Sequence, residues 1–335
     1  MADVQPLKWA YDAGDPEQKR THPARELIEA VRDNRPVEIE SAVINGDVDL
    51  QAVDYEEKLV IRNSVFTGRV DLGEARFGRS VDISGCRFQH DLRFASARID
   101  GHLVLAGVKI RPGIGEPVAA DFEHLEVTGQ LNASSLESDV GLSFAQAAVG
   151  AGAEFEGVKI DGDLDFELAS IGGHFSCRSL PGRRAEILGR LGLANAGVGG
   201  EVRLGGAKIG WESQAKSRPD ALSLAGASVG GDVSANTAGG HRTEVLGTIS
   251  LRGGTFRGDL SLDGAKVGRQ VDAAHPFAVA GKLNLADAEI AGNVSCRVSG
   301  EHRAEILGTV SMRGARIGGL VALDGIRIGP EARSK

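Results

Sequence analysis

The segment that most resembles a catalytic motif is Gly226-Ala227-Ser228-Val229-Gly230, which fits the G-x-S-x-G pattern of a nucleophile elbow. That pattern works only at a sharp turn from a strand into a helix, because the turn exposes the serine hydroxyl. The related segments 206–210 and 264–268 keep both glycines but carry lysine in place of serine. We therefore expect Ser228 at a variable, outward position of a repeat, without a catalytic role.

Other residue types that could do chemistry are isolated. Gly281-Lys282 lacks the following Ser or Thr of a phosphate-binding loop, and the histidines form no H-E-x-x-H motif. Cys86, Cys177 and Cys296 are too scattered for a zinc site or a disulfide framework. The sequence predicts no catalytic residue, no cofactor and no metal site, and so not an enzyme.

Charged residues are placed more regularly than these. Basic residues recur at a spacing of 11, as at Arg76, Arg87, Arg98 and Lys109. Acidic residues recur at a spacing of 11 or a multiple of it, as at Asp49, Asp71 and Asp82. We expect basic and acidic stripes on different faces, and these residues are our candidates for binding a protein partner. The alternative is that the charges only keep strand edges from pairing sideways.

Apolar residues share the same period, as in the series Phe66, Phe77, Phe88, Ile99 and Ile110. One unit reads apolar-x-apolar-x-x-Ala-x-apolar-x-Gly-x, and its apolar pairs two apart are typical of very short strands. Two such units would close one four-sided coil. With 47 glycines and only 4% aromatic residues, the core must be narrow. The repeat predicts an all-β solenoid, a right-handed parallel β-helix of about 12 coils over residues 36–329.

Phe77 is expected to stack in register with Phe88 or Ile99. Glycine recurs at the tenth position of the unit, as at Gly46 and Gly68, where we expect a corner with positive φ.

Three inserted segments interrupt the repeat. Residues 177–189 and 296–308 are near copies, and 235–247 matches them more loosely. We interpret them as bulged corners carrying Arg or His. An anion site beside His241 and His302 is the alternative to simple duplication.

Segments such as Ala75-Arg76-Phe77-Gly78-Arg79 and Ala97-Arg98-Ile99-Asp100-Gly101 resemble the units of the pentapeptide-repeat superfamily. The resemblance covers residues 37–329 and implies a right-handed quadrilateral β-helix. Every second face has six residues instead of five, and Asp or Asn rarely follows Ala, so the chain is similar to a divergent member. The resemblance also implies one specific function, that of an acidic DNA mimic that binds a topoisomerase.

Three classes of function are thus open: a non-catalytic scaffold that binds proteins or self-associates end to end, a DNA mimic, and an enzyme of unknown reaction. The net charge of −8 is modest and the two signs are interspersed, which disfavours both direct nucleic-acid binding and duplex mimicry. An enzyme would need a pocket. We expect the scaffold. The few cysteines, and the lack of a signal peptide or a long apolar stretch, predict a cytoplasmic location.

The two ends of the repeat differ. Residues 1–20 are expected to form a polar tail. Residues 21–35 are expected to form a helical cap, because Ala24, Leu27, Ile28 and Val31 have helical spacing. The cap would cover the first coil.

No similar cap follows the last coil, since residues 330–335 are a polar tail. The last coil presents Val321, Leu323, Ile326 and Ile328. Because open strand edges pair with another chain, we predict a homodimer joined at these residues.

Overall fold

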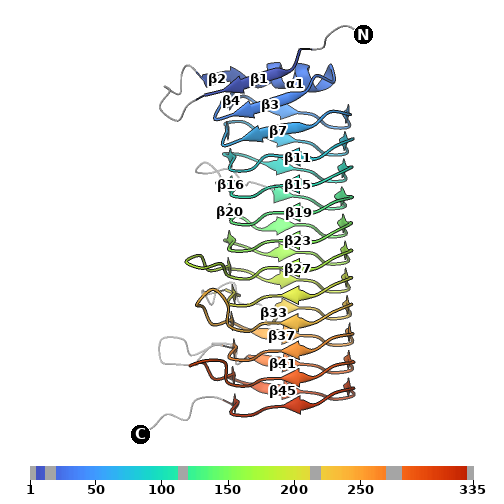
Figure 1. Ribbon diagram of the computed structural model, residues 1–335, viewed down its shortest axis with the longest axis vertical. Helices are drawn as coiled ribbons and strands as arrows, with labels where there is room; N and C mark the ends of the chain where they lie inside the picture. The colour runs from blue at the N-terminus through green and yellow to red at the C-terminus, as the bar shows by residue number, and fades with distance from the viewer. Residues whose placement is uncertain (1–4, 12–19, 112–119, 212–219, 269–280, 330–335) are drawn as a thin grey trace.

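The computed structural model describes residues 5–11, 20–111, 120–211, 220–268 and 281–329. They form a rod of four parallel β-sheets that run along its length, with one helix across its N-terminal end (Figure 1). The predicted right-handed parallel β-helix is confirmed. We name the sheets A to D, in the order in which each coil of the chain passes through them.

Sheets A and B have 13 strands each. Sheet A consists of β1 (Leu7–Ala10), β3 (Val37–Glu40), β7 (Leu59–Arg62), β11 (Val81–Asp82), β15 (Leu103–Val104), β19 (Leu131–Asn132), β23 (Ala153–Glu154), β27 (Phe175–Ser176), β31 (Val202–Arg203), β35 (Val233–Ser234), β39 (Leu260–Ser261), β43 (Val294–Ser295) and β47 (Val321–Ala322). Sheet B consists of β2 (Thr21–Pro23), β4 (Val43–Asn45), β8 (Val65–Phe66), β12 (Arg87–Phe88), β16 (Lys109–Ile110), β20 (Glu137–Ser138), β24 (Lys159–Ile160), β28 (Glu186–Ile187), β32 (Lys208–Ile209), β36 (Glu244–Val245), β40 (Lys266–Val267), β44 (Glu305–Ile306) and β48 (Arg327–Ile328).

Sheets C and D have 11 strands each. Sheet C consists of β5 (Val48–Asp49), β9 (Val70–Asp71), β13 (Leu92–Arg93), β17 (Ala120–Asp121), β21 (Leu142–Ser143), β25 (Leu164–Asp165), β29 (Leu191–Gly192), β33 (Asp220–Ser223), β37 (Thr248–Ser250), β41 (Lys282–Asn284) and β45 (Thr309–Ser311). Sheet D consists of β6 (Asp54–Tyr55), β10 (Arg76–Phe77), β14 (Arg98–Ile99), β18 (Glu126–Val127), β22 (Ala148–Val149), β26 (Ser170–Ile171), β30 (Gly197–Val198), β34 (Ser228–Val229), β38 (Thr255–Phe256), β42 (Glu289–Ile290) and β46 (Arg316–Ile317).

Each strand turns one side chain inward and the next outward, which is why a unit with apolar residues two apart can wrap a core. Phe77 pairs with Tyr55 on the preceding coil and with Ile99 on the following one. Of the two neighbours expected for it, Ile99 is therefore correct and Phe88 is wrong. Phe88 lies on sheet B, on the opposite side of the rod from sheet D, which carries Phe77.

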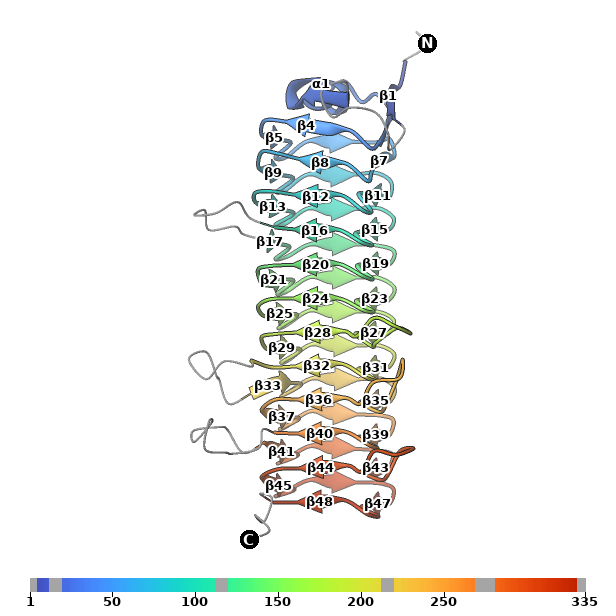
Figure 2. The same ribbon diagram turned by 90° about the vertical axis from the view of Figure 1, so that its left-hand side faces the viewer.

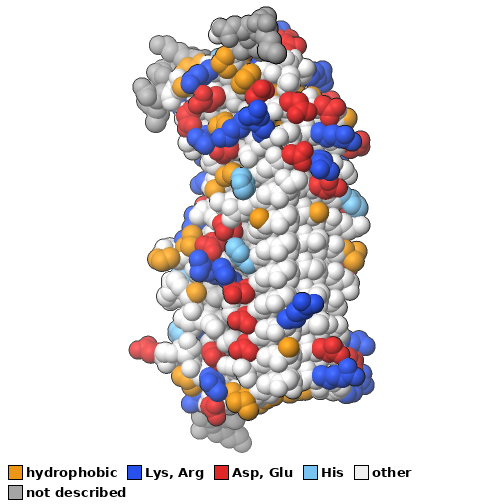
Figure 3. Space-filling model, turned by 45° about the vertical axis from the view of Figure 1, so that its right-hand side comes forward, with side chains coloured by type: hydrophobic (Ala, Val, Ile, Leu, Met, Phe, Trp, Pro, Cys, Tyr) orange, Lys and Arg blue, Asp and Glu red, His pale blue; other side chains and the backbone are white. Residues whose placement is uncertain are grey.

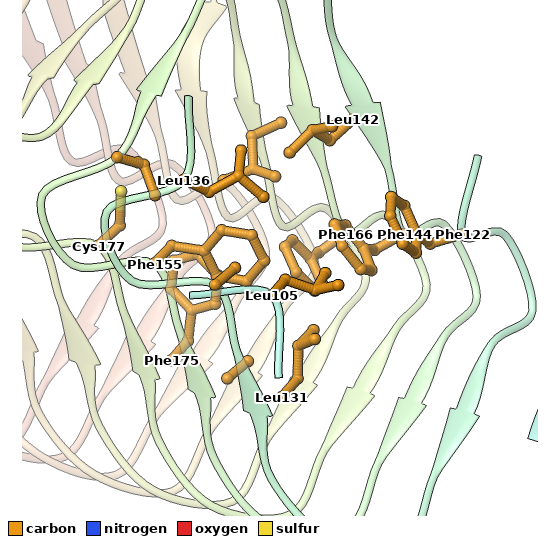
Figure 4. Close-up of a cluster of buried hydrophobic side chains, with 14 of the residues drawn as sticks. Leu105, Phe122, Leu131, Leu136, Leu142, Phe144, Phe155, Phe166, Phe175 and Cys177 are labelled. Atoms are coloured by element: carbon orange, nitrogen blue, oxygen red, sulfur yellow. The ribbon is translucent and has the colours of Figure 1, made fainter. Parts of the chain in front are cut away.

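Aromatic residues fill the middle of the rod. Phe122, Phe144 and Phe166 come from three consecutive coils, and their ring centroids are 4.5 and 4.8 Å apart in a stack. Phe155 meets this stack edge-on, with its centroid 5.4 Å from that of Phe166 (Figure 4). The core is thus a continuous column of stacked side chains.

The corners differ from expectation in one respect. The left-handed conformation falls at the fifth position of the unit, and non-glycine residues adopt it too, such as Ala52 (φ 51°) and Glu74 (φ 58°). Glycine at the tenth position instead permits close stacking. A Cβ on Gly68 would lie 2.4 Å from the backbone of Gly46, on the coil before. The expected positive φ is therefore confirmed at Gly46 (φ 98°) and wrong at Gly68, so it is not a general property of this position.

The N-terminal end is more ordered than a polar tail. Residues 7–10 form β1, which pairs with β3, and β2 pairs with β4. Trp9 stacks on His22 with ring centroids 3.8 Å apart, and the Tyr11 hydroxyl lies 2.7 Å from Nε2 of His22. The helix α1 (Ala24–Arg32) buries Leu27 and Val31 against the first coil. The helical cap thus has its expected place, with narrower bounds.

The inserted segments are short hairpins at the corner between sheets A and B. Each closes through one antiparallel bridge: Leu180 with Arg183, Ala238 with His241, and Ser299 with His302. Figure 2 shows them projecting from one side of the rod at its C-terminal half. Val271, which continues the period in the sequence, lies outside the described residues, and β40 and β41 complete their coil without it.

Candidate interaction surfaces

The structure separates the residues that the sequence grouped as candidates for binding. Arg87 and Lys109 lie on sheet B, but Arg76 and Arg98 lie on sheet D, the opposite face of the rod. The acidic candidates are also divided, with Asp49 and Asp71 on sheet C and Asp82 on sheet A. The residues of each expected stripe therefore form two shorter rows, and these rows lie on opposite faces of the rod.

The acidic candidates have structural partners. An Oδ1 atom of Asp49, Asp71 and Asp82 accepts the backbone N–H two residues ahead, at 3.1, 2.9 and 3.1 Å. This local bond stabilises the turn that follows each strand. Asp82 also accepts two hydrogen bonds from Arg62, at 2.6 and 2.8 Å. Burial would raise the pKa of Asp82, but the bonds from Arg62 and Ser84 outweigh it and hold the pKa below its usual value.

Sheet B carries an alternating row of charges, which we call the charge ladder. Its members follow one another on successive strands in the order Lys109, Glu137, Lys159, Glu186, Lys208, Glu244, Lys266, Glu305 and Arg327. The Lys109 and Glu137 charges are 3.3 Å apart, and those of Lys159 and Glu186 are 3.9 Å apart. Because neighbours neutralise one another, this face has little net charge.

The first coils have a shallow polar depression of about 690 Å³ on sheet D. Arg76 and Arg98 line it, together with the carboxylates of Asp54, Glu56, Glu74, Asp100 and Glu126. Arg98 lies 3.3 Å from Asp100 and 3.2 Å from Glu126. Carboxylates outnumber the arginines here, so this is not a basic surface.

The middle of sheet D is free of charged side chains over several coils. Its outward residues there are Ala148, Ser170, Gly197, Ser228 and Thr255. Figure 3 shows this smooth stretch between charged groups near the two ends of the rod. Ser228 therefore lies within a strand of a flat parallel sheet, between Gly197 and Thr255, and not at a strand-to-helix turn.

The hairpins hold one another through arginine. Arg184 Nε donates to the carbonyl of Gly206 on the next coil at 3.2 Å, and its Nη2 donates to the carbonyl of Arg242, two coils on, at 2.8 Å. The same Nη2 lies 3.5 Å from Glu244.

Arg242 repeats this arrangement one hairpin further along. It donates to the carbonyls of Gly264 at 2.8 Å and of Arg303 at 2.6 Å, and lies 3.5 Å from Glu305. Its guanidinium is thus occupied by protein groups, which does not support the anion site considered beside His241. The sequence shows that these segments are similar to one another. The hydrogen bonds by which their arginines join one hairpin to the next are seen only in the fold.

The three cysteines are buried. Burial raises the pKa of Cys86, Cys177 and Cys296 to about 12, so each is a neutral thiol at neutral pH. Such thiols are poor nucleophiles and poor metal ligands. Among the described residues, no group of three or more His, Cys, Asp or Glu is arranged to hold a metal ion.

The two ends of the rod present different surfaces. At the N-terminal end α1 covers the first coil. At the other end large apolar side chains are exposed: Leu320 (73%), Val321 (43%), Leu323 (37%) and Ile328 (49%). Ile326 is half-buried against the core. Three of the four residues expected at an interface are therefore exposed on the last coil, and Leu320 joins them.

Comparison with known proteins agrees with this architecture. The family model described as pentapeptide repeats, with nine copies, matches residues 61–109. No curated protein matches the chain. No solved structure matches it either. In the described parts of the chain, no helix is both long and apolar enough to cross a membrane.

Proposed function

The chain is a divergent, pentapeptide-repeat-like β-helix, and on this basis we propose that it is a non-catalytic scaffold that docks another polypeptide at its C-terminal coil. The observation that carries the proposal is the contrast between the ends. One end is closed by α1, β1 and β2, whereas the other exposes Leu320, Val321, Leu323 and Ile328. A solenoid that leaves its last coil open has an apolar surface and unpaired strand edges ready for a partner.

The docked polypeptide that we propose is a second copy of the chain. Two copies that meet at their last coils form a closed, two-fold assembly in which both apolar ends are covered. Growth into a filament would instead require the N-terminal end, where Pro23 on the edge strand β2 lacks a backbone N–H for pairing.

The other two classes of function have less support. A DNA mimic needs closely spaced negative charge, whereas the charge ladder on sheet B alternates in sign along the described strands. The one serine in a catalytic-type motif, Ser228, lies on a flat sheet without the required turn.

Light scattering at micromolar concentration tests the proposal. The native chain of 35.0 kDa should have twice that mass. The variant Leu323→Lys places a charge in the interface and should be monomeric. Leu168→Lys is the matched control, because Leu168 is also an exposed leucine (56%) but lies on the side of the rod. A native chain that is monomeric at every concentration would contradict self-association.

A further inference from the structure

Arg184 and Arg242 each bind the next hairpin along the rod, and we call these contacts the arginine clamps. Arg303 is the last arginine in this series. Arg303 occupies the place in the third hairpin that Arg184 and Arg242 occupy in the first two. Those two are each half-buried and reach a carbonyl and a carboxylate two coils further along. The side chain of Arg303 is exposed, and no hydrogen bond or ion pair joins it to any residue that the structure describes. Its equivalent target would lie one coil beyond the last coil that the structure describes.

A second series of polar contacts runs along the same corner, between sheets A and B. Asn236 Oδ1 accepts the backbone N–H of Asp263 at 3.0 Å, and Asp263 Oδ1 accepts the N–H of Arg297 at 2.7 Å. Arg297 Nε then lies 3.4 Å from Asp324. Each of these residues thus contacts its equivalent on the following coil.

This second series ends at Asp324. Its side chain is 83% exposed, and no described residue supplies it with a backbone donor like the one that Asp263 receives from Arg297. At this end of the rod, the corner between sheets A and B therefore presents one anion from the last described coil, Asp324, and one cation from the coil before it, Arg303. Asp324 lies on the side of sheet A, and Arg303 lies on the side of sheet B.

Backbone groups at this end are also complementary. In sheet A the amides donate to the following coil, as Leu260 N–H does to Asn293 and Leu262 N–H to Ser295, both at 2.8 Å. By the same pattern, the N–H groups of the last strand, β47, point out of the end, and no described residue accepts them.

In sheet B the carbonyls accept from the following coil. The carbonyls of Ala304 and Ile306 accept the N–H groups of Arg327 and Gly329, both at 3.0 Å. By this pattern the carbonyls of Ile326 and Ile328 point out of the end. The outward N–H groups of sheet A in one copy can therefore donate to the outward carbonyls of sheet B in another copy.

A two-fold axis through the corner between sheets A and B satisfies all of these groups. It sets β47 of each copy against β48 of the other in antiparallel orientation, so donors meet acceptors. These strands are also the last in the described chain, since sheets C and D end earlier, at β45 and β46. Because the axis exchanges the two sides of the corner, Asp324 of one copy lies below Arg303 of the other.

We propose that two copies join through this corner, with Arg303 of each copy paired to the partner's Asp324. The inference rests on the proposed self-association and specifies its axis and contacts. The pairing continues both polar series across the interface, since Asp324 and Arg303 of one copy supply the charged groups that the next coil would supply to the other copy. It also brings Leu323 and Ile328 of both copies together.

Charge reversal tests the pairing. Arg303→Glu sets two carboxylates against each other at both symmetry-related contacts, and Asp324→Arg sets two guanidinium groups against each other. Each variant alone should raise the dimer dissociation constant about 100-fold, or about tenfold per contact. An equimolar mixture of the two variants should form a heterodimer, because every contact then joins opposite charges. Analytical ultracentrifugation of each variant and of the mixture measures this directly.

Two controls make the result specific. Arg313→Glu reverses an exposed arginine on the same end of the rod, away from this corner, and should leave the dimer unchanged. Melting temperatures check the fold, because Asp324→Arg also removes the partner of Arg297. Arg303→Glu keeps the backbone carbonyl that Arg242 binds.

Two results would overturn the pairing: dimers that persist in both single variants, or a mixture that stays monomeric while the native chain dimerises. In the first case self-association itself stands. A native chain that is monomeric throughout would instead overturn the proposed function on which the pairing rests.

Discussion

Single residues in this rod act in two coils at once. An inward side chain contacts its equivalents above and below, as Phe144 does between Phe122 and Phe166. An outward aspartate such as Asp71 both accepts a turn N–H and lies 2.8 Å from Gln51 on the coil before. One substitution therefore disturbs the chain on both sides of its position.

The first prediction concerns the core. Phe77→Asp should lower the free energy of unfolding by about 4 kcal/mol or more, because it buries an unpaired carboxylate at a 1% exposed site and leaves a cavity. Chemical denaturation measures the change. Arg76→Ser, on the same strand but outward, is the control and should stay near the native value. An equal loss in both variants would contradict the inward placement of Phe77.

The second prediction concerns the thiols. Burial raises the pKa of all three cysteines from about 9 in the unfolded chain to about 12 in the folded one. Their contribution to stability is complete below about pH 9 and is lost as the pH rises toward 12, because only the unfolded chain ionises in between. The melting temperature should fall across this window.

A variant with all three cysteines replaced by alanine should show a smaller fall relative to its own value at pH 8. Part of the fall remains, since burial also raises the pKa of Tyr55 to about 12. Iodoacetamide should leave the native protein unlabelled at pH 8, and rapid labelling would show that the thiols are accessible.

At the scale of the elements, stability depends on contacts between coils. The strands of sheet B are two residues long over most of the rod, and from β20 to β44 each places one charge between opposite charges above and below. The hairpins add longer links, since Arg184 and Arg242 each connect three coils. Charges and hairpins therefore add side-chain contacts to the backbone hydrogen bonds that join successive coils.

The third prediction concerns the charge ladder. Lys159→Glu would place three carboxylates in a row with Glu137 and Glu186, and should cost about 1 kcal/mol at low salt, since the side chain is 55% exposed. Lys159→Gln should cost less. The difference between the two should shrink in high salt because exposed charges are screened. A difference that is independent of salt would mean that packing, and not charge, explains the loss.

The sequence predicts these elements where one side chain repeats at a fixed period. Phe66 and Phe88, or Val70 and Leu92, mark the strands because each buries the same position of the unit. It did not predict β1, because residues 7–10 lie outside the period and are held by pairing with β3 and by the stacking of Trp9 on His22. It also did not predict the hydrogen bonds between hairpins, because Arg184 reaches the carbonyl of Arg242 only where both hairpins project from the rod.

The candidate site was predictable in part for the same reason. Val321, Leu323 and Ile328 could be named because they occupy apolar positions of the last repeat unit in the sequence. Arg303 and Asp324 could not, because their importance depends on what their equivalents contact on the following coil. From the sequence we also placed Arg76 and Arg87 on one basic stripe, although a spacing of one unit places them on opposite faces of the rod.

At the scale of the whole molecule, the rod has one closed and one open end. The closed end carries a helix and an aromatic cluster of Trp9, Tyr11 and His22. At the open end the sheets finish on β45 to β48, with apolar side chains exposed between them. Under the proposed self-association, this asymmetry favours a pair of rods over a filament, because the exposed apolar side chains lie at the end that α1 does not cover.

Hydrogen exchange measured at several protein concentrations tests this account most directly. The N–H groups of Val321 and Leu323 point out of the open end, so they should exchange rapidly in dilute protein. They should become protected at concentrations where the dimer forms, while the amides of β7 to β40 keep the same protection throughout. Exchange at Val321 and Leu323 that does not change with concentration would contradict the C-terminal coil as the docking surface.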